Sequence, residues 1–179
     1  MPMHRPILAL ALLTLAAVPA SARIVIADPQ GEAGASTVAA FRVPHGCGDS
    51  PMLSLRIEIP VAVASAKPQP KPGWLMRIEH APLPKPIPGE NGIPQTQRIA
   101  AVTWMGRLDP DQFDEFRIWL SLPDAAGPLY FPALQRCEQG EAAWTAVPAR
   151  GESWQSLKQA APMLEVRKPV AQAARRRGG

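Results

Sequence analysis

The sequence predicts an all-β protein, an immunoglobulin-like antiparallel β-sandwich with one disulfide. Two stretches alternate apolar and polar residues with the period of a strand, one from Leu53 to Ile59 and one from Phe116 to Leu122. The 22 prolines argue against a helical body, because proline removes a backbone donor and clashes inside helices. About eight or nine short strand-like segments between turn signals are typical of two packed antiparallel sheets, with a barrel as the alternative.

Residues 1–22 are expected to be a secretory signal. Residues 7–18 form an apolar run, and Ala20-Ser21-Ala22 is a small-residue cleavage pattern. As a helix this run would be about 18 Å long, which is too short for the roughly 30 Å hydrocarbon core of a bilayer. We therefore predict cleavage before Arg23, a periplasmic or secreted product, and no stable membrane insertion after signal removal.

The first half of the exported chain is predicted to form strands that end in turns. Residues 23–28 (RIVIAD) are rich in β-branched residues, and the proline and glycines of residues 29–34 indicate a turn. Residues 36–43 (STVAAFRV) lead into the turn that contains Cys47. Residues 52–60 carry the first clear alternation, with Leu53, Leu55, Ile57 and Ile59 on one face.

Two proline-rich stretches separate the middle strands. Residues 67–74 (KPQPKPGW) are expected to be a stiff, extended connector, because each proline fixes φ and disfavours helix in the residue before it. Residues 82–96 are expected to form a long hairpin loop. This loop would join antiparallel strands at residues 74–79 and 98–106.

The last third is predicted to contain shorter strands. After a polar connector at residues 109–114, residues 115–122 alternate and place Trp119 on the polar face, half-exposed. Residues 129–134 lead to Cys137, and Pro132 indicates an edge strand or a bulge. Strands at residues 142–146 and 163–167 flank one or two helical turns at residues 153–160.

We expect one domain at residues 23–167, followed by a disordered basic tail at residues 168–179. Three arginines of the tail and Arg5 of the signal account for the formal net charge of +4, so the domain itself is close to neutral. A neutral domain offers no basic face to nucleic acid. The three arginines of the tail give little affinity for nucleic acid or anionic lipid on their own.

The two cysteines, Cys47 and Cys137, are predicted to form a disulfide. In an oxidising compartment, a pair of cysteines without Cys-x-x-Cys spacing favours one structural disulfide. Two free buried thiols are the alternative. Nothing marks the pair as catalytic.

The sequence carries no recognisable catalytic motif. Gly-x-Ser-x-Gly, His-Glu-x-x-His, P-loop and Gly-x-Gly-x-x-Gly patterns are missing from it, and the predicted exported chain contains only His45 and His80 as histidines. We predict that the protein is not an enzyme. His45 is either a surface metal ligand or a turn histidine hydrogen-bonded to backbone, and His80 is expected to be solvated.

Tryptophans and acidic residues are the remaining candidates for binding. The tryptophans either fill the core and cover sheet edges or stack on a ligand; they are Trp74, Trp104, Trp119, Trp144 and Trp154. The acidic residues around Pro110 are interpreted as a solvated turn, since their spacing does not match a calcium loop; they are Asp109, Asp111, Asp114 and Glu115.

The order of short motifs resembles the YcnI-like family of exported copper-handling domains. The matching stretches run from residue 23 to about residue 166. They are AG (33–34), FRVPHGC (41–47), IEIP (57–60), KPQPKPGW (67–74), TWMG (103–106), FDEF (113–116), LSLPD (120–124), LYFP (129–132), QRCEQG (135–140) and WT (144–145). The resemblance implies a secreted or periplasmic β-sandwich that binds copper(II) without chemical turnover, beside a copper chaperone or another envelope protein.

The resemblance also implies a copper site on the new N-terminus. There a first histidine would offer its α-amine and imidazole, a carboxylate would follow in the next turn, and a tryptophan would lie nearby, a donor set that suits copper(II). This sequence has Arg23 at the histidine position and Gln30 at the carboxylate position, and a guanidinium cannot replace imidazole. Trp144 matches the tryptophan.

Three hypotheses follow from these residues. The first, which we adopt as the prediction, is an exported copper-binding domain of copper homeostasis that uses the Arg23 α-amine with Glu32 or His45, close to Trp144. The second is a metal-free member that acts as a protein–protein scaffold in the cell envelope, with Trp119 and the proline-rich loops as contact surfaces. An exported enzyme is the third, and no set of nucleophile and base supports it.

Overall fold

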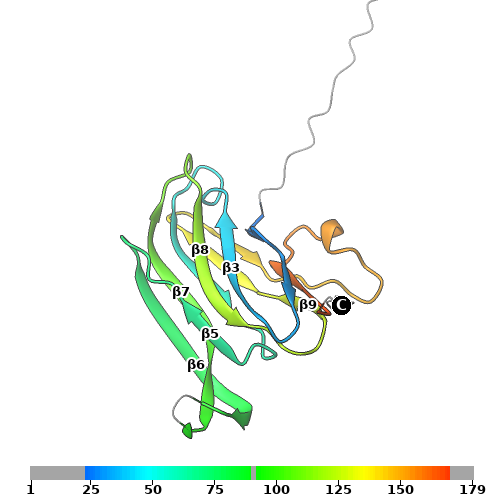
Figure 1. Ribbon diagram of the computed structural model, residues 1–179. Helices are drawn as coiled ribbons and strands as arrows, with labels where there is room; N and C mark the ends of the chain where they lie inside the picture. Colours follow the sequence, from blue (N-terminus) through cyan, green and yellow to red (C-terminus); the bar gives the residue numbers. More distant parts are fainter. Residues whose placement is uncertain (1–22, 90–91, 170–179) are drawn as a thin grey trace, which may run out of the picture.

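The protein is a β-sandwich whose two layers face each other across one core (Figure 1). The computed structural model describes residues 23–89 and 92–169. Within them there is no α-helix, and a 3₁₀ turn, η2, spans Trp154–Ser156. The strands are β1 Val25–Ile26, β2 Gln30–Glu32, β3 Ser36–Val43, β4 Met52–Glu58, β5 Ser65–Pro68, β6 Leu75–Ile87, β7 Gln95–Leu108, β8 Asp114–Ser121, β9 Gly127–Tyr130, β10 Ala133–Cys137, β11 Glu141–Trp144 and β12 Met163–Arg167. The all-β prediction is confirmed.

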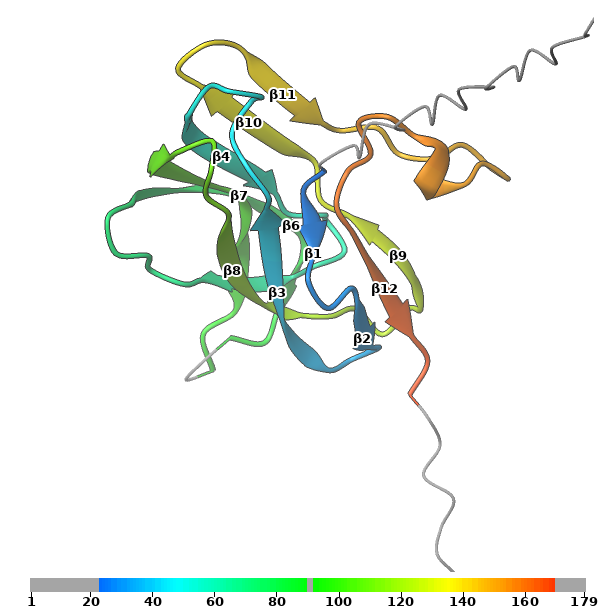
Figure 2. The same ribbon diagram turned by 90° about the horizontal axis from the view of Figure 1, so that it is seen from above.

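The strands form three hydrogen-bonded sheets. A four-stranded sheet in the order β1-β3-β8-β5 faces a five-stranded sheet in the order β11-β10-β4-β7-β6. A small sheet, β2-β12-β9, continues the first layer beside β1 (Figure 2). All pairings are antiparallel except that of β2 with β12.

The alternating stretches bury the faces that their period assigns, with one exception. Phe116, Ile118 and Leu120 of β8 are fully buried, as predicted. In β4, Leu55 and Ile57 are buried but Leu53 is 39% exposed. The prediction was wrong for Leu53 because the pairing with β7 shifts register between Met52 and Ser54, and a bulge of this kind re-aims the side chain.

Both proline-rich stretches contribute to strands, which corrects two predictions. Lys67 and Pro68 belong to β5, and β6 continues to Ile87 through part of the expected hairpin loop. These strands tolerate proline because β5 and β6 each form the edge of a sheet. On an edge strand, a proline without its N–H need not break a ladder hydrogen bond.

Two further segments differ from the sequence prediction. The strand expected at residues 129–134 is two strands, β9 and β10, separated at Pro132, and the chain passes there from the small sheet to the five-stranded sheet. The turn expected at residues 29–34 contains β2, which pairs with β12 through Gln30 and Glu165. Local turn signals do not report such long-range pairing.

The predicted disulfide is present between Cys47 and Cys137. Their Cα atoms lie 6.0 Å apart and they are separated by 90 residues in sequence. The predicted signal at 1–22 and the tail from residue 170 lie outside the described residues. No helix in the described part of the chain is both long enough and apolar enough to cross a bilayer.

Candidate functional site

Arg23, the residue expected to begin the exported chain, is held against the loop that precedes β12. Its Nη2 donates a hydrogen bond of 2.8 Å to the carbonyl oxygen of Leu157. Its guanidinium carbon lies 4.7 Å from the centroid of the Trp154 ring, a cation–π contact. The Trp154 indole in turn donates to the carbonyl of Ala161 at 2.8 Å. Arg23 therefore anchors the start of β1.

His45 and Trp144 meet at one buried glutamine. Gln135, only 2% exposed, donates from Nε2 to the carbonyl oxygen of His45 at 2.7 Å and accepts at Oε1 from the Trp144 indole at 3.3 Å. The His45 ring itself contacts the carbonyl of Gly46 through Nδ1 at 2.6 Å. The nitrogen and the oxygen of the buried Gln135 amide thus each have a hydrogen-bond partner, as is usual for buried polar groups.

The four candidate copper residues are not assembled into one cluster. Glu32 ends β2 opposite Arg167, the last residue of β12, whereas Arg23 contacts Leu157 before that strand begins. Figure 2 shows the start of β1 and the end of β2 at opposite ends of the sheet. Across residues 23–89 and 92–169, no three His, Cys, Asp or Glu side chains gather in a way that would hold a metal. His80 is exposed on β6.

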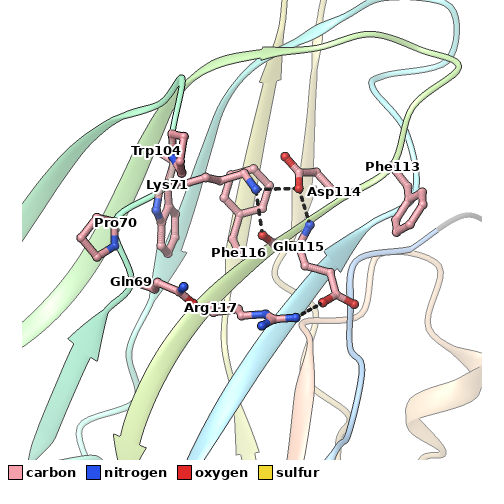
Figure 3. Close-up of a pocket in the computed structure, with 10 residues that line it drawn as sticks. Gln69, Pro70, Lys71, Trp104, Phe113, Asp114, Glu115, Phe116 and Arg117 are labelled. Atoms are coloured by element: carbon pink, nitrogen blue, oxygen red, sulfur yellow. Dashed lines mark hydrogen bonds and ion pairs between the residues drawn. The ribbon is translucent and has the colours of Figure 1, made fainter.

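A pocket of about 380 Å³ lies between the proline-rich strap, residues 69–72, and the start of β8 (Figure 3). The Lys71 ammonium crosses it, 2.6 Å from the Asp114 carboxylate and 3.2 Å from the carbonyl oxygen of Glu115. The same ammonium lies 5.2 Å from the centroid of the Phe116 ring. Phe113, 67% exposed, forms part of the lining.

The charges around this pocket are paired with one another. Glu115 accepts from Arg42 at 2.8 Å and from Arg117 at 3.1 Å, and these two bonds lower the pKa of its carboxyl. Asp114 is paired with Lys71. The acidic residues that we expected to be a solvated turn are therefore divided among separate ion pairs, since Asp109 pairs with Arg107 instead.

A second groove, of about 580 Å³, is lined by Trp119 and by residues 87–89 and 93–95, which flank the connection from β6 to β7. Trp119 is half-buried and lies opposite Val38 of β3 and Lys67 of β5, whose ammonium is 5.6 Å from the ring centroid. Ile87 and Ile93 line the other side of the groove. Val38 is 50% exposed and Ile93 is 71% exposed, so an apolar surface continues around the indole. We call these residues the Trp119 groove.

Comparison with known families identifies the chain. A family model described as "Domain of unknown function (DUF1775)" matches residues 24–166. The chain belongs to this family. It is the YcnI-like family, so the resemblance seen in the motifs is confirmed, whereas the copper site is not tested by this match.

A solved structure supports the fold of this YcnI-like domain. It is an uncharacterized protein from Nocardia farcinica with an immunoglobulin-like fold, 26% identical, and the alignment has a TM-score of 0.60. The alignment covers 80% of this chain and 97% of that chain. A comparison with curated proteins finds no match. The immunoglobulin-like sandwich is thereby confirmed.

Sequence reasoning missed two features of the site. Gln135 was not a candidate, although the alternation of Ala133, Gln135 and Cys137 in β10 places it on the inward face. The contact of Arg23 with Leu157 joins residues 134 positions apart, and no local pattern signals it.

Proposed function

We propose that this YcnI-like domain is an exported, non-enzymatic binding domain that recognises another protein of the cell envelope through the Trp119 groove. The observation that carries the proposal is the convergence of the two expected contact features, Trp119 and the proline-rich loop, in one groove. Tryptophan is enriched among the residues that contribute most of the binding energy of protein interfaces. The disulfide supports export, because such bridges persist in oxidising compartments.

The groove favours an extended, apolar or proline-containing segment of the partner. About half of its lining is apolar, with Ile87, Pro88, Ile93 and Pro94 in the same groove as Trp119, and the rest is polar, from Ser65, Lys67, Gln95 and Ser121. An aromatic surface next to such residues accommodates aliphatic and proline side chains without needing buried charges. The position of the groove over the edge strand β5 leaves it open to an extended chain.

Copper(II) binding is the second candidate function. The expected ligands depart from the pattern of the family, because Arg23 has no imidazole and Glu32 lies opposite Arg167, at the far end of β12 from the Leu157 contact of Arg23. One observation still favours it, namely that Gln135 bonds both the backbone carbonyl of His45 and the indole of Trp144, so that these two residues are near each other. Coordination would then need the α-amine of Arg23, which exists only after signal cleavage.

Photo-crosslinking in the native host tests the proposed function. A photoreactive residue at Val38 should give one discrete adduct with an envelope protein, and Trp119→Ala should abolish it while the protein remains folded by circular dichroism. The same residue at the exposed Glu152 is the control and should give no such adduct. An adduct at Val38 that survives Trp119→Ala would overturn the proposal.

Copper titration separates the two candidates. The secreted protein is first characterised by intact mass to establish its N-terminal residue, and copper(II) is then added to the same sample. If the chain begins at Arg23 and binds one equivalent tightly, the second candidate is supported and His45→Ala should weaken that binding. If it binds none, copper binding is refuted, and the proposed protein interaction through the Trp119 groove is not affected by this result.

A further inference from the structure

The outer face of the five-stranded sheet carries a second ordered set of side chains, independent of the Trp119 groove. Strand register places Arg77 of β6 opposite Thr103 of β7, and Arg136 of β10 opposite Ser54 of β4. The two arginines lie on β10 and β6, the strands that flank the pair β4–β7, and Ser54 and Thr103 lie two rows apart in the register of that pair. All four residues line a depression of about 210 Å³.

Arg56, which also lines this depression, is paired with two neighbouring carboxylates. Arg56 bonds to Glu79 through Nη2 at 3.1 Å and also contacts the carboxylate of Glu58. The hydrogen bond from Arg56 lowers the pKa of Glu79, and Glu79 in turn raises the pKa of Arg56. Arg56 is thus held in place by two carboxylates of the same sheet face.

The flanking arginines are free of comparable bonds. Among the described residues, the side chain of Arg77 makes no hydrogen bond and interacts with Glu79 through charge alone, and Arg136 forms an ion pair with Glu141 at 3.7 Å, beyond hydrogen-bonding distance. Ser54 and Thr103, each with one hydroxyl, line the same depression. The depression therefore offers two guanidinium groups and two hydroxyls as donors.

These donors suit an anion with oxygens that point in several directions. One guanidinium fork is sufficient for the two coplanar oxygens of a carboxylate, whereas a tetrahedral phosphate can accept from opposite sides and from below at once. Serine and threonine hydroxyls supply further donors from the floor. We propose that this depression is a phosphate-binding site, in which Arg77 and Thr103 hold the group from one side and Arg136 and Ser54 from the other.

A titration of the full-length secreted protein with inorganic phosphate tests this site. At constant ionic strength, maintained with chloride, the backbone amide signals of Ser54, Thr103 and Arg136 should shift saturably in ¹H–¹⁵N spectra. Arg77→Gln and Arg136→Gln should each weaken the apparent affinity by about fivefold or more, because each removes a charged donor. Arg117→Gln, which removes one exposed arginine from the other sheet, is the matched control and should leave the affinity unchanged.

Several results would overturn the proposal. Shifts that grow linearly without saturation, or an equal loss of affinity in Arg117→Gln, would indicate a general ion atmosphere and not a site. Saturable binding of acetate with equal affinity would refute the argument for a tetrahedral anion. Far-ultraviolet circular dichroism of each variant excludes unfolding as the cause of a loss.

The source of the phosphate group is decided by vesicle sedimentation. Phosphatidylcholine vesicles with and without phosphatidic acid are compared, using the same variants. Sedimentation that needs phosphatidic acid and is lost in Arg77→Gln supports the site with a lipid headgroup as its ligand. Saturable phosphate binding without sedimentation supports the site with a soluble phosphate compound as its ligand.

Discussion

Removal of the disulfide is expected to have the largest effect on stability. In the double variant Cys47→Ala with Cys137→Ala, the unfolded chain regains the conformational freedom of a loop that spans a separation of 90 residues. The loop-closure model puts the loss at about 4–5 kcal/mol in the free energy of unfolding. With a urea m-value of about 2 kcal/mol/M, the unfolding midpoint should fall by about 2 M.

The folded state of this variant should remain close to native. The two turns are joined by hydrogen bonds that do not involve sulfur, from the Glu138 amide to the Pro51 carbonyl at 2.9 Å and from the Gln139 amide to the Ser50 hydroxyl at 2.8 Å. The effect should therefore arise mainly in the unfolded state, whose expansion also raises the m-value.

Urea unfolding followed by tryptophan fluorescence measures both quantities. The wild-type protein kept in reductant is the matched control and should unfold at the same urea concentration as the double variant. A change below about 1 kcal/mol, or equal midpoints for the oxidised and reduced proteins, would refute the loop-closure reasoning.

Three smaller perturbations test the packing and the ion pairs. Gln135→Leu should cost about 1–2 kcal/mol in urea unfolding, because it removes the partner of the Trp144 indole and of the His45 carbonyl and leaves two partly buried groups unpaired. Glu115→Gln should reduce the loss of stability in acid. The pKa of Glu115 is lower in the folded protein than in the unfolded chain, so the ionised carboxylate stabilises the fold above the unfolded pKa. This stabilisation disappears as the pH falls below about 4.5 and through the folded pKa. Gly106→Ala should cost about 1–3 kcal/mol in thermal unfolding, since the added Cβ would lie 2.5 Å from the Trp74 ring.

Each of these has a result that contradicts it. Unchanged stability of Gln135→Leu would mean that the amide network contributes nothing beyond apolar packing. If the stability of Glu115→Gln falls in acid as steeply as that of the wild type, the bonds from Arg42 and Arg117 to Glu115 do not cause the acid dependence. Gly106→Ala with wild-type stability would show that the indole moves aside without cost.

Much of the fold could be predicted from the sequence because strand periodicity is a local property. The alternation in β8 identified its buried face, and the single pair of cysteines identified the disulfide. The order of the short motifs along the chain also identified the family. Each of these signals depends on residues that are close together in the chain or on a residue type that occurs only twice.

The spatial arrangement of the candidate site residues could not be predicted, because proximity in sequence says little about proximity in space. Arg23 and Glu32 are close in the chain, yet the structure places them at opposite ends of β12. Conversely, Trp119 and Ile93 come together in one groove although a strand and a loop separate them.

The sequence by itself therefore determined the strand period, the disulfide and the family of this protein. The tertiary structure alone decided strand order, the edge positions that accept proline in β5 and β6, the bulge that exposes Leu53, and the alignment of Arg77 with Thr103. The physical reason is that a side chain's face follows from a period of two residues, whereas register and strand order depend on hydrogen bonds and packing between segments far apart in the chain.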